Sequence, residues 1–420
     1  NSPTLCQLYV AWALQPLRRK WTNTIVYHYM DDILCCQQQP FVNEHIEQLT
    51  ELLAEKGLIV APEKVQQSAP WKYLGWTIES AKIRPQKLTL KTPLKTLTDV
   101  QTVLGDIQWV RNCAGITNVD IKPLTDLLRG TQPAADVVLK EEHHIALQCI
   151  VDKLSAAWTS RRLLDLSISL LICNLGDSPF ARDKSASKTT NHTFFVILEW
   201  MFLRVQPCTS IQTRPEAVGE LVRKGRSRII ELTGQEPADI SIPISAVDLE
   251  WWMRHSLPIQ EALLDYDGVV HSQQPPGKLW QLVKQNQWLE KPKVVDRPIP
   301  QGKTVYTDAG KRSKQAVCVW PETDQWHRQI LPGQEGDTLQ TLELTAVVWA
   351  LENWLNLPLN VVTDSLYVAG LVPRIQDALI KETNNPRLGK LFVQLRSVIS
   401  QRTAPCAVIH IRSHQWELGL

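Results

Sequence analysis

The stretch TIVYHYMDDILCC, residues 24–36, sets two adjacent acids between two strand-like arms. Apolar and aromatic residues alternate before the acids and resume after them, which predicts the two strands of a β-hairpin. Asp31 and Asp32 then lie at the turn, where Asp is favoured and the carboxylates can project. Two carboxylates held together repel each other unless a divalent cation neutralises them, and phosphoryl transfer uses such cations to clamp the reacting oxygens. An acidic turn in solvent is the alternative interpretation.

The composition is that of a globular protein with about two to four domains. The chain has 420 residues, of which 44% are hydrophobic and 21% charged. Its net charge of +2 is low for a nucleic-acid-binding protein, so any such surface must be local. Nine cysteines without a Cys-x-x-Cys pair argue against a zinc site or a disulfide framework, and we expect reduced thiols in an intracellular setting.

Neither a membrane span nor a signal peptide is expected. The best apolar run, residues 163–175, contains Asp165 and is too short to cross a bilayer. The first residue is Asn1 rather than Met, and a helix signal follows at once, with Ser2 as cap and Pro3 at the first helical position. We therefore expect a fragment or a processed product that starts inside a domain.

The tetrad Tyr29-Met30-Asp31-Asp32 resembles the polymerase signature of retroviral reverse transcriptases. Residues 1–4 are similar to the family segment that enters the palm helix beside the incoming nucleotide. The resemblance implies that the two acids bind metal and act in catalysis, and that Tyr29 and Met30 contact nucleic acid. In the family a further catalytic Asp and the fingers come earlier in the chain. We therefore expect an incomplete polymerase site and no DNA synthesis by this chain alone.

Two helices are predicted around the hairpin, one from Ser2 onward and one over residues 41–56. The apolar face of the first is expected to comprise Leu5, Leu8, Trp12 and Leu17.

The aromatic segment 71–78 follows where the family has its primer grip, a hairpin that presses the primer end toward the metals. The resemblance implies nucleic-acid contacts by Tyr73, Leu74, Gly75 and Trp76. A core hairpin with buried aromatics is the alternative. Five bases come next without an intervening acid, and they either contact phosphates or form a solvated face: Lys82, Arg84, Lys87, Lys91 and Lys95.

A helix is predicted over residues 99–111, and a second one over about 141–158. Gln101, Gly105 and Trp109 recur every four residues and so share one face of the first helix. In the reverse transcriptase thumb the matching residues follow the minor groove of the template–primer duplex. A buried Trp packed over a Gly is the alternative.

Residues 164–296 resemble the retroviral connection, an RNase H-like fold without an active site. Strands are predicted at 168–173, 194–198 and 240–244 and a helix at 216–232, and the polar residues 177–191 are predicted to form a loop. A basic cluster on the helix either meets a phosphate backbone or is solvated: Arg223, Lys224, Arg226 and Arg228.

The Pro-rich linker 296–302 precedes a segment whose predicted order is three strands, a helix and a fourth strand, as in the opening half of an RNase H fold. Asp308, Glu343 and Asp364 match the catalytic carboxylates of that family in order and setting. Two follow strands and the third lies on the helix. The resemblance implies that they bind two Mg²⁺ or Mn²⁺ ions, hard cations that prefer oxygen ligands.

The strand predicted at 406–411 leads to His414, which by resemblance lies in a mobile loop and helps product release or protonation. The family's fourth acid follows this His at the start of a last helix. Residues 415–420 do not match that continuation, so we expect an RNase H site that lacks one ligand and the closing helix.

Together these features predict a multidomain chain of α+β and α/β folds that resembles the reverse transcriptase–RNase H part of a retroviral or endogenous-retroviral Pol polyprotein, closest to the alpha- and beta-type viruses. The expected domains are a partial palm at 1–85, a helical thumb at 86–163, an RNase H-like connection at 164–296 and an RNase H domain at 297–420.

The resemblance implies metal-dependent cleavage of the RNA strand of RNA–DNA hybrids beside an incomplete RNA-directed DNA polymerase site. The implied partners are the hybrid, a template–primer duplex, a dNTP in the complete family enzyme, and a second subunit in a homo- or heterodimer. The implied location is intracellular or in the virion. Two alternatives stay open, a catalytically inactive nucleic-acid-binding or dimerising subunit and a decayed retroviral remnant.

Overall fold

The computed structural model describes residues 2–86, 94–129, 136–175, 178–189, 192–242, 244–272, 293–323 and 325–412. The chain divides into two compact units, residues 1–167 with 183–200, and residues 168–182 with 201–420. None of the nine cysteines forms a disulfide in the described part of the chain. Among the described residues, no helix has both the length and the apolar character that a membrane crossing requires.

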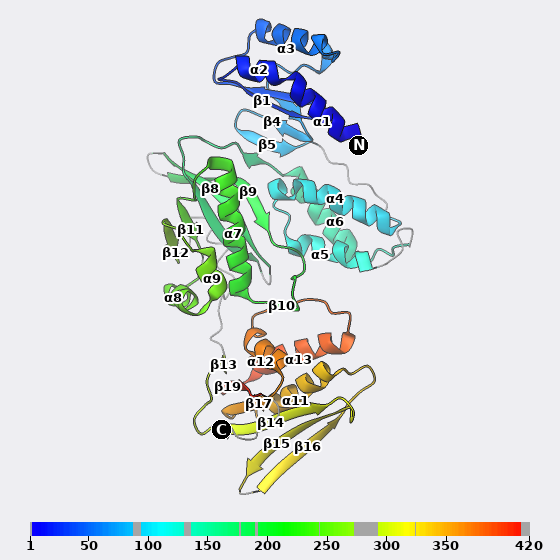
Figure 1. Cartoon of the computed structure of the whole chain (residues 1–420), viewed down its shortest axis with the longest axis vertical. Coiled ribbons are helices and arrows are strands. Elements are labelled where there is room, and N and C mark those ends of the chain that lie inside the picture. The colour runs from blue at the N-terminus through cyan, green and yellow to red at the C-terminus, as the bar shows by residue number, and fades with distance from the viewer. Residues whose placement is uncertain are drawn as a thin grey trace. The chain divides into compact units, whose positions relative to one another are not determined.

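The N-terminal elements form a small α/β body around the predicted hairpin (Figure 1). They are α1 (Ser2–Ala13), α2 (Gln15–Lys20), β1 (Ile25–Tyr29), β2 (Asp32–Cys36) and α3 (Asn43–Glu55). The two strands pair antiparallel, with Tyr29 opposite Asp32. Their core is built from Val10, Ala13, Leu14, Leu17, Val26 and Leu53.

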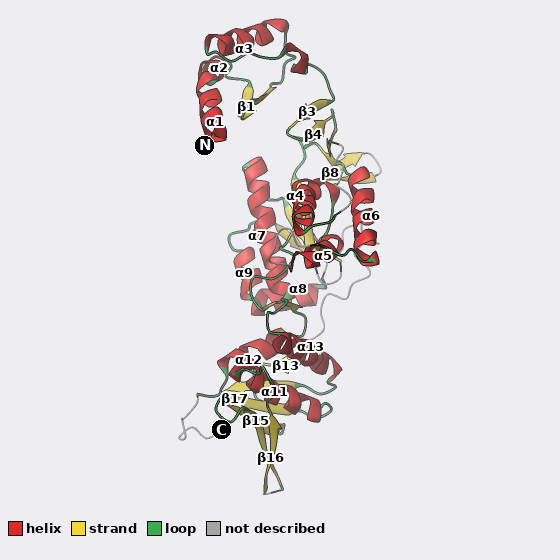
Figure 2. Ribbon diagram, turned by 90° about the vertical axis from the view of Figure 1, so that its right-hand side faces the viewer, coloured by secondary structure: helices red, strands yellow, loops and turns green. Residues whose placement is uncertain are grey.

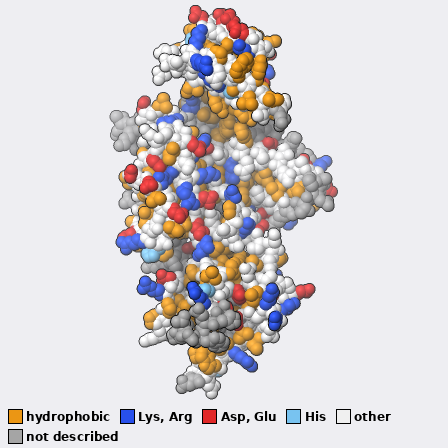
Figure 3. All heavy atoms as spheres, in the orientation of Figure 1, with side chains coloured by type: hydrophobic (Ala, Val, Ile, Leu, Met, Phe, Trp, Pro, Cys, Tyr) orange, Lys and Arg blue, Asp and Glu red, His pale blue; other side chains and the backbone are white. Residues whose placement is uncertain are grey.

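The predicted apolar face of α1 is wrong in part. Leu17 is buried, but Leu5, Leu8 and Trp12 are 66%, 61% and 55% exposed, because the helix packs through Val10 and Ala13 instead. Figure 3 shows hydrophobic side chains gathered over this end of the chain.

A second hairpin and a three-helix bundle complete the first unit. The hairpin strands β3 and β4 continue into β5 and β6 as one four-stranded sheet. The bounds of these elements are β3 (Trp71–Tyr73), β4 (Trp76–Ile78), β5 (Lys82–Pro85), β6 (Thr159–Ser160), α4 (Leu97–Ala114), α5 (Asn118–Asp126) and α6 (Glu141–Ser155). Gly115, at φ 64°, ends α4 in the left-handed conformation. The helix α5, which carries Pro123 in its interior, is not among the predicted elements.

The middle of the chain contains a five-stranded sheet in the order β12-β11-β7-β8-β9. Its elements are β7 (Ile168–Leu175), β8 (Ser178–Thr189), β9 (His192–Phe202), α7 (Arg214–Thr233), β11 (Asp239–Ser241), α8 (Ala246–His255), α9 (Leu257–Ala262) and β12 (Val269–His271). The loop predicted at 177–191 is therefore wrong for most of its length. Its polar sequence lacks the apolar pattern of a core strand, and pairing between two neighbouring strands gives β8 its extended conformation.

The C-terminal elements form a six-stranded sheet in the order β13-β19-β17-β14-β15-β16, with α11 and α13 packed together on one side of it (Figures 1 and 2). The strands are β13 (Val294–Val295), β14 (Lys303–Gly310), β15 (Gln315–Glu322), β16 (Gln325–Pro332), β17 (Leu359–Thr363) and β19 (Cys406–His410). The helices are α11 (Leu339–Asn353), α12 (Leu366–Leu371) and α13 (Pro386–Gln401). A short pair, β10 (Ile211–Gln212) with β18 (Leu379–Ile380), joins this body to the middle part of the same unit.

Both ends of α11 are fixed by side chains. Thr338 caps the first turn by accepting from the Thr341 N–H at 3.3 Å. At the other end Arg402, 1% exposed, donates to the carbonyls of Leu351, Trp354 and Leu357 at 2.8 to 3.1 Å. The guanidinium thereby binds carbonyls at the end of the helix, where intrahelical partners run out, and one carbonyl in the turn that follows.

Candidate active site of the C-terminal domain

Two of the predicted acids leave neighbouring parallel strands at the same edge of the sheet. In the register of β14 and β17, Thr307 lies opposite Thr363. Asp308 is the next residue of β14, where it pairs with Val317 of β15 rather than following the strand as predicted, and Asp364 directly follows the end of β17. Asp308 is exposed and Asp364 half-buried. The parallel pairing therefore brings together two carboxylates that are far apart in the sequence.

The third predicted acid lies on the helix that covers this part of the sheet. Glu343 occupies the second turn of α11, which packs against β14. Burial raises the pKa of the Glu343 carboxyl, a hydrogen bond from Ser365 lowers it, and the charges of Asp364 and Asp308 raise it again. The direction of the net shift is upward, with burial as its largest cause and the charges of the two other acids as smaller contributions.

The three carboxylates of Asp308, Glu343 and Asp364 are chemically suited to bind a divalent cation. Within the described ranges, no three His, Cys, Asp or Glu side chains stand together as a preformed metal site. Glu343 is half-buried, and the charges of Asp364 and Asp308 raise the pKa of its carboxyl, a repulsion that a bound cation would relieve. Carboxylate oxygens are also the ligands that Mg²⁺ and Mn²⁺ prefer.

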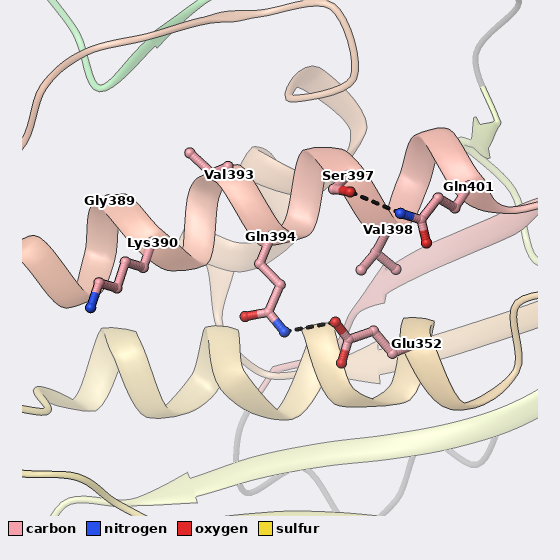
Figure 4. Close-up of a pocket in the computed structure, with 8 residues that line it drawn as sticks. All are labelled: Glu352, Gly389, Lys390, Val393, Gln394, Ser397, Val398 and Gln401. Carbon is pink, nitrogen blue, oxygen red and sulfur yellow. Dashed lines mark hydrogen bonds between the residues drawn. The ribbon is translucent and has the colours of Figure 1, made fainter.

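The remaining predicted residue of this site, His414, lies outside the described residues. A groove of about 730 Å³ between α11 and α13 is a separate feature (Figure 4). One of its lining residues, Glu352, lies nine residues after Glu343 on the same helix, about 13 Å along its axis. The groove is therefore not the acid site.

The second candidate site is the hairpin of Asp31 and Asp32, both of which are exposed. Met30 adopts a left-handed conformation at φ 53°, which is uncommon for a residue with a side chain. Its N–H donates to Oε1 of Gln7 on α1 at 2.6 Å. The turn is therefore held to the helix that packs beside it.

The hairpin of β3 and β4 approaches both the acidic hairpin and the thumb helix. The rings of Tyr73 and Tyr27 meet edge to face with centroids 6.4 Å apart. Burial raises the pKa of the Tyr73 hydroxyl, and Tyr27 and Asp32 contribute in the same direction. On the other side, a Cβ added to Gly75 would lie 3.4 Å from Nε1 of Trp109. Aromatic groups from three predicted segments thus form one surface within this unit.

The turn between the strands consists of Leu74 and Gly75, at φ 45° and 80°. Leu74 and Trp76 are half-buried. A two-residue turn with both φ values positive matches the twist of a tight hairpin, so the predicted hairpin is confirmed as a structure.

The predicted face of α4 is open to solvent. Gln101 and Gly105 are exposed, a Cβ added to Gly105 would meet nothing within 4 Å, and Trp109 is 60% exposed. The alternative of a buried Trp packed over a Gly is therefore wrong.

The basic cluster of α7 is engaged within the chain. Arg223 pairs with Glu261, Arg226 with Glu236 and Arg228 with Glu231, while Lys224 donates to the Phe202 carbonyl. These interactions compete with a phosphate backbone for the same cations. Of the five predicted bases near the second hairpin, Lys87 and Lys91 lie outside the described residues, and Arg84 pairs with Glu79 at 3.0 Å.

Two polar residues that contact the candidate sites were not singled out from the sequence. They are Gln7, which binds the turn of the acidic hairpin, and Ser365, whose Oγ donates to Oε2 of Glu343 at 2.5 Å. Ser365 follows Asp364 directly at the start of α12, which is a sequence signal for a helix cap but not for its second partner.

Four family models match consecutive parts of the chain. The reverse transcriptase (RNA-dependent DNA polymerase) model matches residues 1–78, and the reverse transcriptase thumb domain model matches residues 85–148. The ERVK-8-like, RNaseH-like domain model matches residues 189–280, and the RNase H model matches residues 300–418. With the folds described above, these matches define a chain of reverse transcriptase and RNase H domains.

Relatives that align with almost the whole chain identify the kind of polyprotein it resembles. The Gag-Pro-Pol polyprotein of Mason-Pfizer monkey virus is 30% identical over 421 residues, and that of sheep pulmonary adenomatosis virus 31% identical over 423 residues. Each alignment covers 99% of this chain and 23% of the relative, so the chain spans less than a quarter of the length of these polyproteins. The chain corresponds to the reverse transcriptase–RNase H part of a retroviral Pol polyprotein, with betaretroviruses among its relatives.

Proposed function

We propose that the C-terminal domain cleaves the RNA strand of RNA–DNA hybrids through Asp308, Glu343 and Asp364. The observation that supports the proposal is the pairing of β14, which carries Asp308, with β17, which Asp364 follows, together with the packing of α11 and its Glu343 against β14. The domain boundaries that accompany this proposal are the palm at 1–85, the thumb at 86–163, the connection at 164–296 and RNase H at 297–420.

The proposed division of labour follows from where each acid lies. Asp308 and Asp364 are fixed by adjacent strands and would hold two Mg²⁺ or Mn²⁺ ions from one side, while Glu343 would complete the ligand set from the helix. Bound ions would supply activation of the attacking water and neutralisation of the leaving oxygen. The proposed substrate is an RNA–DNA hybrid, which a protein can recognise by its shape and by the 2′-hydroxyls of its RNA strand. His414 keeps its proposed role in product release or protonation.

The test is cleavage of a labelled RNA–DNA hybrid by the full chain in Mn²⁺. We expect the RNA strand to be cut, and Asp364→Asn to lower the rate by a factor on the order of 100 or more because a carboxylate at the reacting centre is lost. Glu335→Gln, at an exposed position before α11, is the matched control and should cleave like the wild type. Cleavage that survives Asp364→Asn would refute the site.

A second function, duplex binding without cleavage, is favoured by the exposed surface of α4 and the second hairpin. Gln101, Gly105 and Trp109 would contact the duplex there, together with the hairpin segment 73–76. We expect Trp109→Ala to weaken hybrid binding by about 10-fold, the scale of one aromatic contact to nucleic acid, and binding to fall steeply with salt. Ile145→Ala, at a 61% exposed position on α6, is the control.

The acidic hairpin keeps its proposed role at a polymerase site. Asp31 and Asp32 would bind a second pair of ions, and Tyr29 and Met30 would contact the template–primer duplex, with a dNTP as substrate in the complete family enzyme. A homo- or heterodimer and an intracellular or virion-associated location are further proposals that depend on the resemblance to the family. Sedimentation of the purified chain at several concentrations tests the dimer.

A further inference from the structure

We infer that Ser365 is a positioning residue that holds the carboxylate of Glu343 toward the two strand-end acids, an inference that rests on the ribonuclease function proposed above. The Ser365 Oγ donates to Oε2 of Glu343 at 2.5 Å, across 22 positions of sequence. Ser365 is 7% exposed, so little water competes for the bond. The contact joins the turn after β17 to the face of α11.

The hydroxyl of Ser365 is itself fixed by its surroundings. It accepts from the Val368 N–H at 3.3 Å as the cap of α12, and the Ser365 N–H donates to Oγ1 of Thr363 at 3.2 Å. A serine hydroxyl has one hydrogen and two lone pairs. With a lone pair used by the helix cap, the single hydrogen is available for Glu343, so the bond requires no reorganisation of the turn.

The bond opposes a repulsion that the site creates. Asp308 and Asp364 both act electrostatically on Glu343, whose flexible side chain could otherwise rotate its carboxylate away from them. Ser365 directly follows Asp364, so the element that carries one acid also orients another. Hydrogen-bond partners of ligand carboxylates typically affect metal affinity or activity by about 10- to 100-fold.

The first experiment measures Mn²⁺ binding to the full chain by electron paramagnetic resonance. We expect Ser365→Ala to weaken binding by about 10- to 100-fold, and Ser365→Thr, which keeps the hydroxyl, to stay within about threefold of the wild type. Asn385→Ala is the matched control, because it removes the cap of α13 in the same domain without touching an acid. Wild-type affinity in Ser365→Ala, or an equal loss in Asn385→Ala, would overturn the inference.

The second experiment separates this inference from the ribonuclease itself. Thermal unfolding of the metal-free chain is compared for Ser365→Ala in the wild-type and Glu343→Ala backgrounds. We expect a larger fall in Tm in the wild-type background, where the bond exists, and equal falls would overturn the inference. If the wild-type chain neither bound Mn²⁺ nor cleaved the hybrid, the proposed function would be refuted. The comparison of the two backgrounds would still decide whether Ser365 and Glu343 form their hydrogen bond.

Discussion

The backbone N–H of Met30 donates to the side-chain oxygen of Gln7, and the 2.6 Å bond ties the acidic turn to α1. Met30 is in the left-handed region, so the turn depends on its surroundings to hold that conformation. We expect the Met30 amide of Gln7→Ala to exchange with solvent about fivefold faster, because one such hydrogen bond contributes about 1 kcal/mol. Amide hydrogen exchange measures the change directly.

The control for this prediction is Gln48→Ala. Gln48 accepts from Nε1 of Trp21 at 3.3 Å in the same small body and does not contact the turn. Its replacement should leave exchange at Met30 unchanged. Equal exchange at Met30 in Gln7→Ala and in the wild type would show that the bond does not hold the turn.

The thumb should lose stability in acid through Asp120. This side chain, 12% exposed, meets Nζ of Lys153 at 2.5 Å and accepts from Thr117. Burial raises the pKa of Asp120, but the bonds from Lys153 and Thr117 outweigh burial and leave the pKa below its ordinary value. A depressed carboxyl pKa stabilises the folded state above the unfolded pKa of about 3.9, and this contribution is lost as pH falls through the folded value.

We therefore expect Asp120→Asn to be less stable than the wild type at neutral pH by about 2 kcal/mol, with the difference shrinking below pH about 4. Urea unfolding at a series of pH values measures both quantities. Asp126→Asn, which removes an exposed pair with Lys122, is the control and should change stability by less than about 1 kcal/mol. A constant difference at every pH would contradict the assignment.

Gly115 is required for two reasons that a matched pair of variants can separate. Its φ is 64°, and an added Cβ would lie 2.8 Å from ring atoms of Trp200. Gly57 has φ 72° with nothing within 4 Å of the added Cβ. Gly57→Ala should cost about 1 kcal/mol from the backbone alone, and Gly115→Ala a further 1–3 kcal/mol from overpacking, as measured by urea unfolding. Equal costs would contradict the close approach of Trp200.

Arg402 holds the end of the helix that carries Glu343. Arg402→Met would remove the guanidinium that donates to the carbonyls of Leu351, Trp354 and Leu357. We expect a loss of about 3 kcal/mol or more in urea unfolding. Arg328→Met, on the exposed strand β16, should be close to neutral, and similar losses in the two variants would show that the capping bonds contribute little.

The C-terminal domain was predictable because its strands and its main helix have clear local patterns. The predicted order of three strands, a helix and a fourth strand is the order of β14, β15, β16, α11 and β17. That Asp308 and Asp364 belong to one site was implied by their match in order and setting to the carboxylates of the RNase H family. The link between Ser365 and Glu343 was not predictable, because it depends on how a turn and a helix pack.

The failures elsewhere have a common physical cause. The predicted face of α1 follows the number of its apolar residues. Burial depends instead on which side of the helix meets α3 and the hairpin. The strand β8 is polar and lacks the alternating apolar residues typical of a strand. The helix α5 has only nine residues and contains Pro123. In each case tertiary contacts decided the structure against a weak local preference.

The pairing of β14 with β17 has one more consequence. Because Asp308 and Asp364 each follow one member of the last paired residues, Thr307 and Thr363, the gap between their backbones approximates the inter-strand repeat common to all β-sheets, about 4.8 Å. That length is set by main-chain geometry rather than by the identity of surrounding side chains. Many side chains elsewhere in the domain can therefore be substituted without increasing the distance between the backbones of these two acids.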